Sequence, residues 1–479
     1  MYHGRTASFA VALVILMLTI IPAYAQVSPD KATKPPPPPS SSGTTFEKAI
    51  ATLQYSYAED VQQTSDGGYV VGADSCSSTF CYVALVVKLD SNSNLQWQRQ
   101  YQFPGLSTQL YALRQTSEGG FVWAGDVQDF NGCSECALVV KLDSNGNVQW
   151  QHSYSGLNEA QANSIVQTAD GGYVVAGYTS PSQSTYPPPA VQAWIEKLDS
   201  SGNLQWQEAL ESSNTVYGNS VQQTSDGGYV LAGYSGSPPT ILVAKFDSGG
   251  NVKWQTLYTA PVPTGSIGGQ IGYSVIQTSD GGYLVGGVNT QSALALKLSS
   301  GGSVQWSNTY TVNGASSQFS SVRQTTDGGY VFAGYYLTGA SYGGYNSWIV
   351  RTDSGGSVQW QKTYGATTQS REFQKISLTS DGGFVAVGWT VQFSPNNQLY
   401  IVKTDSAGNV NSCSDVLSTS ATTANGSVTS SSAHLSISVP TNRGASGNAT
   451  ASSISFTLRK SARNRFSQPA PNGTSIPLY

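Results

Sequence analysis

The sequence has few charged residues and very few histidines. Only 10% of its 479 residues are Asp, Glu, Lys or Arg, and the net charge is -4. Nucleic-acid phosphates are bound by clustered Lys and Arg, so this composition argues against a nucleic-acid partner. Of the three histidines, His3, His152 and His434, only His152 lies within residues 44–412, so a multi-histidine metal site cannot be assembled there. We therefore expect no metal and no cofactor.

Long hydrophobic runs are absent except at the N-terminus. An apolar run covers residues 9–21 after the basic Arg5, and Ala23, Tyr24 and Ala25 form a small-x-small cleavage pattern. This pattern predicts a signal peptide at residues 1–25, and hence a secreted or cell-surface protein with no membrane span after cleavage. The alternative is an uncleaved anchor, because the run approaches the length that spans a bilayer.

Cysteine is also scarce, with five residues. Cys76 and Cys81 lie in one variable stretch, Cys133 and Cys136 in the matching stretch of the next repeat, and Cys413 follows the last repeat. In an exported protein these pairs favour structural disulfides, with the connectivity open. A redox role for Cys133 and Cys136 is the alternative, but the strand-to-helix context that lowers a thiol pKa is missing.

Glycine and tyrosine, in contrast, are abundant, and they recur in a repeat. An acid followed by two glycines appears seven times, with spacings of 52, 52, 56, 54, 47 and 54 residues. A period near fifty is typical of a propeller blade. The seven acids are Asp66, Glu118, Asp170, Asp226, Asp280, Asp327 and Asp381.

Each repeat contains four short runs of strand-forming residues. In the third repeat these runs are 163–168, 173–179, 193–199 and 203–208, with Asp and Gly in the connections between the first two and between the last two. The seventh repeat lacks the tryptophan of its fourth run, whereas Phe46 stands 20 residues before Asp66, as Trp150 stands before Asp170. We therefore predict an all-β, seven-bladed β-propeller of four-stranded blades, closed by the N-terminal strand, rather than an open solenoid.

The segments on either side of the repeats differ in composition. Residues 26–43 are rich in Pro and Ser and predict a disordered linker, the propeller is placed at 44–412, and residues 413–479 form a tail rich in Ser, Thr and Asn. Its two alternating runs, 435–439 and 454–458, favour a small hairpin or an added strand. The tail also holds all three glycosylation sequons, at Asn425, Asn448 and Asn472.

Most of the repeated charges have a structural interpretation. A base recurs at one position of the third run in every repeat, for example Lys245, and we expect it to pair with the acid of the Gly-Gly turn; a ring of bases for an anionic ligand is the alternative. Arg114 and Arg323 share another repeated position and are interpreted as structural. The stretch from Asp143 to Asn147 hints at a calcium loop, but a hairpin turn is required there.

Residues outside the repeated positions are better candidates for a site. The turns between the first two runs and between the last two runs are nearly constant in length, and strand polarity places both on one face of the propeller. The other connections vary and share the opposite face, called the variable face. A ligand site is expected on the variable face or at the mouth of the central channel. The repeated tryptophans are assigned to packing between blades. Non-repeated acids that lie near the variable face are Asp74, Asp126, Asp129, Glu135, Glu159 and Glu372. The predicted ligand-binding residues are Trp389, Tyr186, Asp126, Asp129 and Glu372.

The repeat pattern of residues 44–412 resembles that of uncharacterised secreted microbial β-propeller repeat proteins, and it is distantly similar to quinoprotein-like and kelch-like propellers. The resemblance implies the fold and says little about activity. The chain departs from quinoprotein dehydrogenases, which have eight blades and a vicinal disulfide, and from copper-containing kelch enzymes, which use two histidines.

The leading functional hypothesis is a non-catalytic, monomeric extracellular or cell-surface propeller that binds a glycan, a peptide or a surface protein through its variable face. No catalytic residue is assigned, because nothing in the sequence marks a nucleophile. One alternative is a secreted polysaccharide hydrolase or lyase that uses two carboxylates at the channel mouth. The other is a structural component of the cell envelope.

Overall fold

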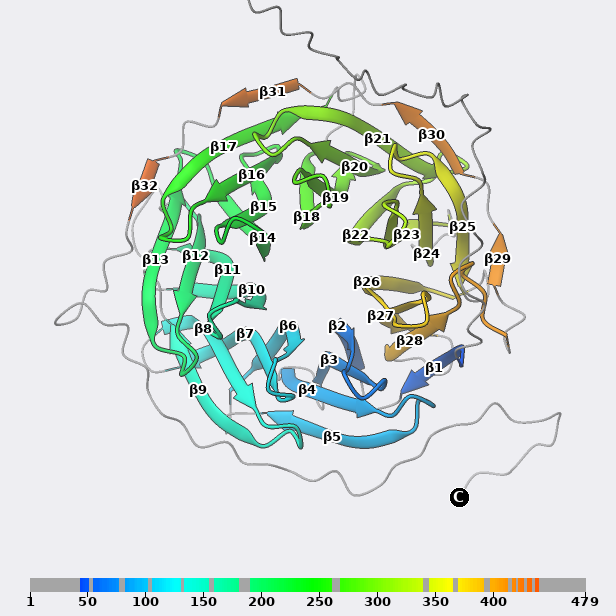
Figure 1. Ribbon diagram of the computed structural model, residues 1–479, viewed down its shortest axis with the longest axis horizontal. Helices are drawn as coiled ribbons and strands as arrows, with labels where there is room; N and C mark the ends of the chain where they lie inside the picture. The colour runs from blue at the N-terminus through cyan, green and yellow to red at the C-terminus, as the bar shows by residue number, and fades with distance from the viewer. Residues whose placement is uncertain are drawn as a thin grey trace, which may run out of the picture. The chain divides into compact units, whose positions relative to one another are not determined.

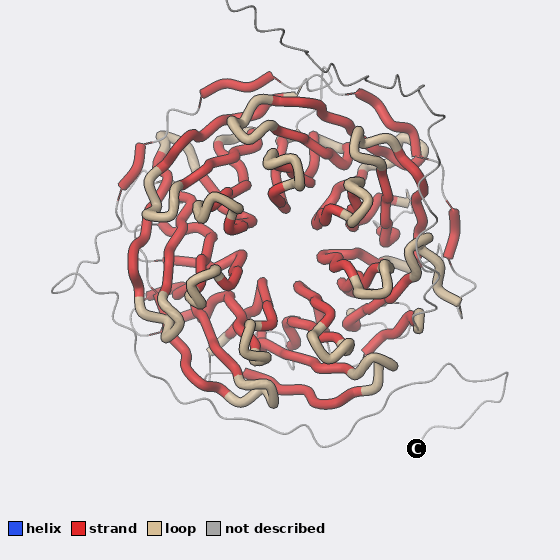
Figure 2. Tube along the Cα trace, in the orientation of Figure 1, coloured by secondary structure: helices blue, strands red, loops and turns tan. Residues whose placement is uncertain are grey.

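A computed structural model describes the repeats and part of the tail. The described residues are 44–50, 55–76, 82–101, 106–130, 133–154, 159–180, 190–260, 268–338, 344–364, 369–391, 397–411, 416–418, 421–425, 429–432 and 436–438, with only the backbone at 129–130, at 133 and in the tail. The expected signal peptide and linker, and Cys81, Tyr186, Cys413, Asn448 and Asn472, lie outside these residues. The described residues form strands and turns and contain no helix (Figure 2).

The first three repeats each form an antiparallel unit of four consecutive strands. The first contains β2 (Tyr55–Gln63), β3 (Tyr69–Cys76), β4 (Tyr82–Leu89) and β5 (Leu95–Tyr101). The second contains β6 (Thr108–Gln115), β7 (Phe121–Phe130), β8 (Cys133–Leu142) and β9 (Val148–Tyr154). The third contains β10 (Glu159–Gln167), β11 (Tyr173–Ser180), β12 (Gln192–Leu198) and β13 (Leu204–Glu211).

The later repeats follow the same order. The fourth contains β14 (Val216–Gln223), β15 (Tyr229–Ser235), β16 (Thr240–Phe246) and β17 (Val252–Thr259). The fifth contains β18 (Gln270–Gln277), β19 (Tyr283–Asn289), β20 (Ser292–Leu298) and β21 (Val304–Val312). The sixth contains β22 (Ser317–Gln324), β23 (Tyr330–Leu337), β24 (Tyr345–Thr352) and β25 (Val358–Tyr364). The seventh contains β26 (Arg371–Leu378), β27 (Phe384–Thr390) and β28 (Gln398–Thr404).

Hydrogen bonding joins these units into six sheets. The second and third units belong to one nine-stranded sheet, because a single parallel bridge links Glu135 of β8 to Glu159 of β10. Within that sheet the antiparallel order of each four-stranded unit is intact.

The four-stranded units are arranged as the blades of a β-propeller (Figure 1). The first strand of each unit lies innermost and contacts the first strand of the next, in the order β2, β6, β10, β14, β18, β22 and β26. Strand β26 in turn contacts β2. Buried apolar residues fill the space between neighbouring units, so that each hydrophobic cluster is shared by two of them.

The N-terminal strand β1 (Phe46–Ile50) pairs antiparallel with β28 of the last unit, with Phe46 opposite Lys403. It occupies the outer edge, where the other units have a fourth strand of their own. Phe46 also packs against Tyr69 of the first unit, at a centroid distance of 5.5 Å. Trp97 packs in the same way on Phe121 of the second unit, at 5.7 Å.

The tail adds short strands to the outer edges of four units, in reverse order along the chain (Figure 1). β29 (Val416–Ser418) pairs with β25, β30 (Ala421–Asn425) with β21, β31 (Thr429–Ser432) with β17, and β32 (Ser436–Ser438) with β13. Of the two structures expected for the run 435–439, the added strand is observed. The run 454–458 lies outside the described residues.

The Gly-Gly turns follow from two steric requirements. Gly67 has φ +81°, which glycine adopts without strain. A Cβ on Gly68 would lie 2.3 Å from the Leu89 carbonyl and 2.7 Å from Lys88 Nζ, so only glycine leaves room for the lysine. Lys88 Nζ lies 2.8 Å from Asp66. The expected pairing of strand base and turn acid is confirmed at all seven positions.

The second set of turns receives the repeated tryptophans. Gly146 has φ +78°, and a Cβ there would lie 2.9 Å from the Trp97 ring of the preceding unit. Tyr101 of the same preceding strand donates a hydrogen bond of 2.7 Å to the Gly146 carbonyl. The prediction that these tryptophans pack between neighbouring blades is therefore confirmed. The Asp143 carboxylate accepts hydrogen bonds from the backbone N–H groups of Asn145 and Asn147, as the hairpin interpretation of this stretch requires.

Candidate functional site

Seven register-equivalent residue pairs lie at the end of the inner two strands, away from the Gly-Gly turns. In each unit one further residue pair separates this pair from a β-bulge in the first strand. Bulges commonly re-aim side chains beside functional sites. The pairs are Tyr57 and Asp74, Gln109 and Asp126, Gln161 and Tyr178, Tyr217 and Tyr234, Ile271 and Val288, Gln318 and Tyr335, and Glu372 and Trp389.

Glycine makes the bulge possible in six of the seven units. A Cβ on Gly177 would lie 1.7 Å from the Gln161 carbonyl, so no other residue permits this approach of the two strands. The next residue in the sequence, Tyr178, belongs to the register-equivalent pair of this unit. In six repeats the glycine that ends the Val-rich run therefore precedes this tier of side chains, whereas in the first repeat Ala73 occupies that position.

Aromatic residues from this tier contact one another across several units. Tyr178 lies 5.1 Å from Tyr217, and Tyr217 stacks on Tyr234 at 4.7 Å, measured between ring centroids. We call the full set the aromatic arc, and all of its members are half-buried. It consists of Tyr57, Tyr178, Tyr217, Tyr234, Tyr335, Tyr345 and Trp389.

The other half of the arc surrounds Trp389. Its ring lies 6.3 Å from Tyr57 and 6.4 Å from Tyr345, in edge-to-face geometry with both, and Tyr345 lies 5.1 Å from Tyr335. Trp389 Nε1 donates a hydrogen bond of 3.3 Å to Glu372. Edge-to-face contacts are a favourable arrangement for aromatic pairs and help to fix the orientation of the rings.

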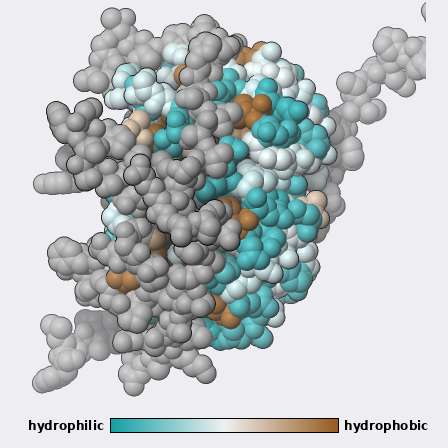
Figure 3. Space-filling model, turned by 90° about the vertical axis from the view of Figure 1, so that its left-hand side faces the viewer, coloured by the Kyte–Doolittle hydropathy of each residue, from teal (hydrophilic) through white to brown (hydrophobic). Residues whose placement is uncertain are grey.

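Exposed apolar side chains are rare elsewhere among the described residues. Only Tyr55 and Tyr82 of the large hydrophobic residues are more than about one-third exposed, at 40% and 38%. Figure 3 shows one side of the molecule, where the described surface is mainly hydrophilic and its hydrophobic residues are scattered. Apart from Tyr345, which begins β24, the aromatic arc lies on the inner two strands.

Carboxyl groups gather beside the arc, in the first three units. Glu135 accepts hydrogen bonds of 3.0 Å from Gln161 Nε2 and 3.2 Å from the Tyr178 hydroxyl. Gln161 also donates to the Tyr111 hydroxyl at 3.0 Å. Asp74 and Asp126 are almost fully buried, at 3% and 0% exposure. Among the described residues, neither Asp126 oxygen has a hydrogen-bond partner within the distance limit for such a bond.

Burial raises the pKa of each of these carboxyl groups. It raises the pKa of Asp126 to about 8, with a further contribution from Glu135, while the Tyr111 hydroxyl acts in the opposite direction. Burial raises the pKa of Asp74 well above its usual value, and the charges of Glu59 and Asp126 add to the effect. Burial likewise raises the pKa of Glu372 to about 7. These acids hold protons near neutral pH more readily than exposed acids do.

The structure brings several of the expected site residues together. Trp389 lies at the centre of one half of the arc, and Glu372 is its hydrogen-bond acceptor. Asp126 lies in the same tier, but its burial keeps it from direct contact with a ligand. Tyr186 and the side chain of Asp129 lie outside the described residues.

The expected modification sites are only partly described. Cys76 is buried in β3 and Cys136 in β8. The side chain of Cys133 and all of Cys81 lie outside the described residues, so the pairing among these four cysteines stays a prediction. Asn425 ends β30. Glycosylation at this residue, at Asn448 and at Asn472 likewise stays a prediction.

Sequence analysis missed most of the arc. The sequence pattern did not distinguish Tyr178, Tyr217, Tyr234 and Tyr335, because each lies within a repeated strand to which a structural role was assigned. The signal was the glycine of the bulge: in six repeats the residue after it varies among Asp, Tyr, Val and Trp, although its neighbours are nearly constant. This variation could have marked Tyr178, Tyr234 and Tyr335, whereas Tyr217 lies on the partner strand and carried no such signal.

No group of three or more potential metal-ligating side chains occurs among the described residues. A search of the same part of the chain for a helix able to cross a membrane also found none.

Comparison with known proteins finds similarity to solved structures only. No protein-family model and no curated protein sequence matches the chain. Among solved structures, it is similar to the NanB sialidase of Streptococcus pneumoniae, with a TM-score of 0.41 and 11% identity over 75% of this chain and 70% of that one. It is also similar to Drosophila Plexin A in complex with Semaphorin 1b, with a TM-score of 0.39 and 9% identity over 75% and 88%. A further match is the extracellular domains of Drosophila Semaphorin 1b, with a TM-score of 0.38 and 8% identity over the same shares.

Proposed function

We propose that this protein is a non-catalytic propeller that binds a glycan through the aromatic arc. The observation that carries the proposal is the arc itself: seven half-buried aromatic residues from five repeats, in two groups of contacting rings, with all but Tyr345 at one end of the inner strands. Sugar rings present apolar C–H faces that pack on aromatic rings, and binding sites are typically aromatic surfaces with a few well-placed polar groups.

The polar groups beside the arc suit hydroxyl-rich ligands. Gln109, Gln161 and Gln318 occupy the same register position in three units and offer both donors and acceptors. Glu135 and Glu372 offer carboxyl oxygens next to aromatic rings. A peptide or surface protein is the other partner class that these features would accept.

The experiment is a glycan array probed with the full chain, followed by calorimetry on the best ligand. We expect Trp389→Ala and Tyr217→Ala each to weaken binding at least tenfold, since each removes a stacking surface. Trp254→Ala is the matched control: its ring packs on Gly302 between blades, so this variant should lose thermal stability and keep its affinity. Equal affinities for Trp389→Ala and the parent protein would refute the proposal.

Cleavage of a polysaccharide, by hydrolysis or by elimination, is the second candidate function, and one observation favours it. Acids outside the repeated positions influence one another. Burial raises the pKa values of Asp74 and Asp126, and the charge of Asp126 adds to the shift of Asp74 as that of Glu135 does for Asp126. Their burial opposes it, because a catalytic pair must reach the glycosidic bond. Release of reducing sugar from an array ligand, abolished in Asp126→Asn and Glu135→Gln, would establish the enzyme and remove the non-catalytic proposal.

We further propose that the repeats form a closed ring of seven blades, completed by β1. Support comes from seven aromatic contacts of one kind between neighbouring units, with Phe46 of β1 in the tryptophan position of the last. The nine-stranded sheet then counts as two blades. Deleting residues 44–50 should strongly lower the melting temperature, and an unchanged value would speak against closure.

The site of action that we propose is the cell exterior, as a secreted or surface-attached monomer. The support is the N-terminal apolar segment with its Ala-x-Ala pattern. N-terminal sequencing of the protein from culture medium tests cleavage after Ala25.

A further inference from the structure

Four consecutive innermost strands carry charged residues in the bulge or within three residues after it. In order around the axis these strands are β22, β26, β2 and β6. Arg323 lies on β22, Lys375 on β26, Glu59 and Asp60 on β2, and Arg114 on β6. All except Asp60 are half-buried. The remaining three innermost strands are β10, β14 and β18. From the bulge to the C-terminal end of each strand they carry no charged residue.

Two of these residues replace a serine that three other repeats use for contact between blades. Ser164 accepts a hydrogen bond from the backbone N–H of Val221 in the next unit, and Ser220 does the same for Val275. The equivalent residue is Asp60 on β2 and Lys375 on β26. A lysine cannot accept a hydrogen bond, so Lys375 gives up this contact between blades. A residue that breaks a local rule in this way commonly serves a function.

Asp60 is fully occupied by its own neighbours. Its carboxylate accepts hydrogen bonds of 2.9 Å from the N–H groups of Val61 and Leu113, and it forms an ion pair with Arg114. Although burial acts in the opposite direction, the charges of Arg114, Lys375 and Arg323 lower the pKa of Asp60, so this one anion is shared among three cations. Glu59 cannot balance the remaining positive charge completely, because burial raises its pKa to about 7.

The ion pair of this group joins Asp60 to Arg114, and neither Arg323 nor Lys375 forms one among the described residues. Arg323 donates one hydrogen bond of 2.7 Å, to the carbonyl of Val322, and forms no ion pair. Burial lowers the pKa of Lys375 to about 8, and the charges of Arg114 and Arg323 lower it further against the attraction of Asp60 and Glu59. Burial and Arg114 also lower the pKa of Arg323 to about 10, against the attraction of Asp60. Two half-buried cations on adjacent strands destabilise each other unless an anion lies between them.

We propose that Arg323 and Lys375 form a binding site for an oxyanion, such as a carboxylate or a sulfate, on the axis of the propeller. An oxyanion there would accept hydrogen bonds from the guanidinium group and the ammonium group together. The site adjoins the aromatic arc, because Lys375 follows Glu372 by three residues on the same strand, a rise of about 10 Å. The anion is either free in solution or the acid group of a ligand held by the arc; only the second source depends on the glycan-binding proposal.

The first test uses free anions and the full chain. We expect sodium sulfate and sodium acetate to raise the melting temperature by several degrees over sodium chloride at equal ionic strength. Lys375→Gln and Arg323→Gln should lose this increment, whereas Lys253→Gln should keep it, because Lys253 is an exposed lysine on an outer strand. Arg323→Lys retains the charge and should keep part of the effect even if the glutamine variants fold poorly.

The second test compares an oligomer of galacturonic acid with its neutral galactose counterpart by calorimetry. Tighter binding of the acidic oligomer by at least tenfold, lost in Lys375→Gln, assigns the anion to a glycan. Stabilisation by free anions without any oligomer binding keeps the oxyanion site and counts against glycan binding. Equal binding of both oligomers together with no specific effect of sulfate or acetate overturns the oxyanion site and leaves glycan binding in place.

Discussion

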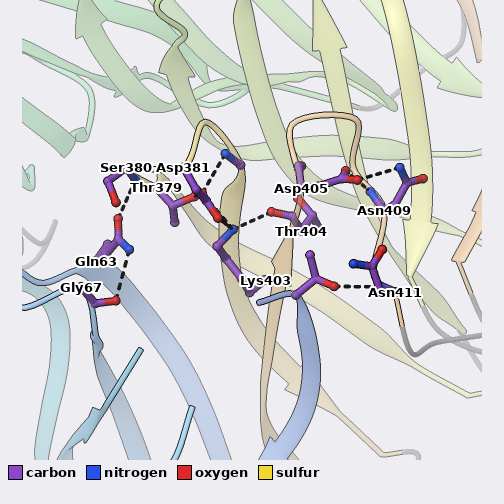
Figure 4. A network of polar contacts seen from close by, with 12 residues as sticks. Gln63, Gly67, Thr379, Ser380, Asp381, Lys403, Thr404, Asp405, Asn409 and Asn411 are labelled. Atoms are coloured by element: carbon purple, nitrogen blue, oxygen red, sulfur yellow. Dashed lines mark hydrogen bonds and ion pairs between the residues drawn. The ribbon is translucent and has the colours of Figure 1, made fainter. Parts of the chain in front are cut away.

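The side-chain carbonyl of Gln63 in β2 accepts a hydrogen bond of 2.7 Å from the backbone N–H of Ser380, 317 residues later in the sequence (Figure 4). The same contact joins neighbouring units elsewhere, as between Gln223 and Ala169. Gln63 also donates to the Gly67 carbonyl within its own turn. One glutamine thus links the first unit to the last as other glutamines link consecutive units.

Replacing Gln63 by alanine should therefore cost as much stability as replacing Gln223. A hydrogen bond of this kind contributes about 1 kcal/mol to the free energy of unfolding, so each variant should unfold at lower urea concentration by a similar amount. If Gln223→Ala lowered stability and Gln63→Ala did not, the first and last units would not be joined in solution.

The turn acids and strand bases make unequal contributions to stability. Lys245 is buried and lies 3.0 Å from Asp226, which is largely exposed. Removing the acid leaves a buried cation without its partner, so Asp226→Asn should cost about 1–3 kcal/mol. Lys245→Met removes the charge and keeps the apolar stem, so its cost should be smaller. Urea unfolding of both variants checks the order, and the reverse order would contradict the interpretation.

The tail strands should stabilise the outer edges to which they pair. A chain that ends at residue 411 lacks β29 to β32 and leaves the edges of β25, β21, β17 and β13 unpaired. We expect faster hydrogen exchange in these four strands, a melting temperature lower by several degrees and a greater tendency to aggregate.

Two comparisons make this tail experiment decisive. Strands β5 and β9 pair with no tail strand among the described residues, so their exchange should not change. A chain that ends at residue 438 retains all four added strands and should behave as the full chain does. Uniform acceleration over all outer strands would instead indicate global destabilisation.

The repeat carried most of the information needed to predict the fold. The Gly-Gly turns, the lysine that pairs with the turn acid and the inter-blade tryptophan recur because every blade meets the same steric requirements, so their roles could be inferred from spacing. Strand ends were less predictable: β10 begins at Glu159, four residues before the predicted start, because the bulge lets pairing continue beyond the regular run.

The candidate site could be predicted only in part, since it depends on which side chains meet across repeats. Trp389 and Glu372 were found because they stand out within the sequence of their own repeat. Lys375 and Asp60 lie 315 positions apart and become neighbours only when the first and last units meet. Burial was also hidden from the sequence: nothing in it distinguishes Asp126, with no exposed surface, from the half-buried Glu135.

Asp126 should make the stability of the protein depend on pH. Its pKa of about 8 in the folded state lies above the value of an exposed Asp, so the folded protein binds more protons than the unfolded one between about pH 4 and 8. Its contribution is therefore most favourable at low pH and is lost as the pH rises toward 8, by up to about 1.4 kcal/mol for each pH unit. The groups that affect this pKa are Glu135 and the Tyr111 hydroxyl.

Asp126→Asn removes this titration and keeps the shape of the side chain. The melting temperature of the variant relative to the parent protein should therefore rise steadily between pH 5 and 8. Asp247→Asn is the control, because hydrogen bonds from Asn251 lower the pKa of this exposed turn acid, so its difference from the parent protein should stay constant over that range. A constant difference for Asp126→Asn as well would mean that Asp126 is already ionised at pH 5 in the folded protein.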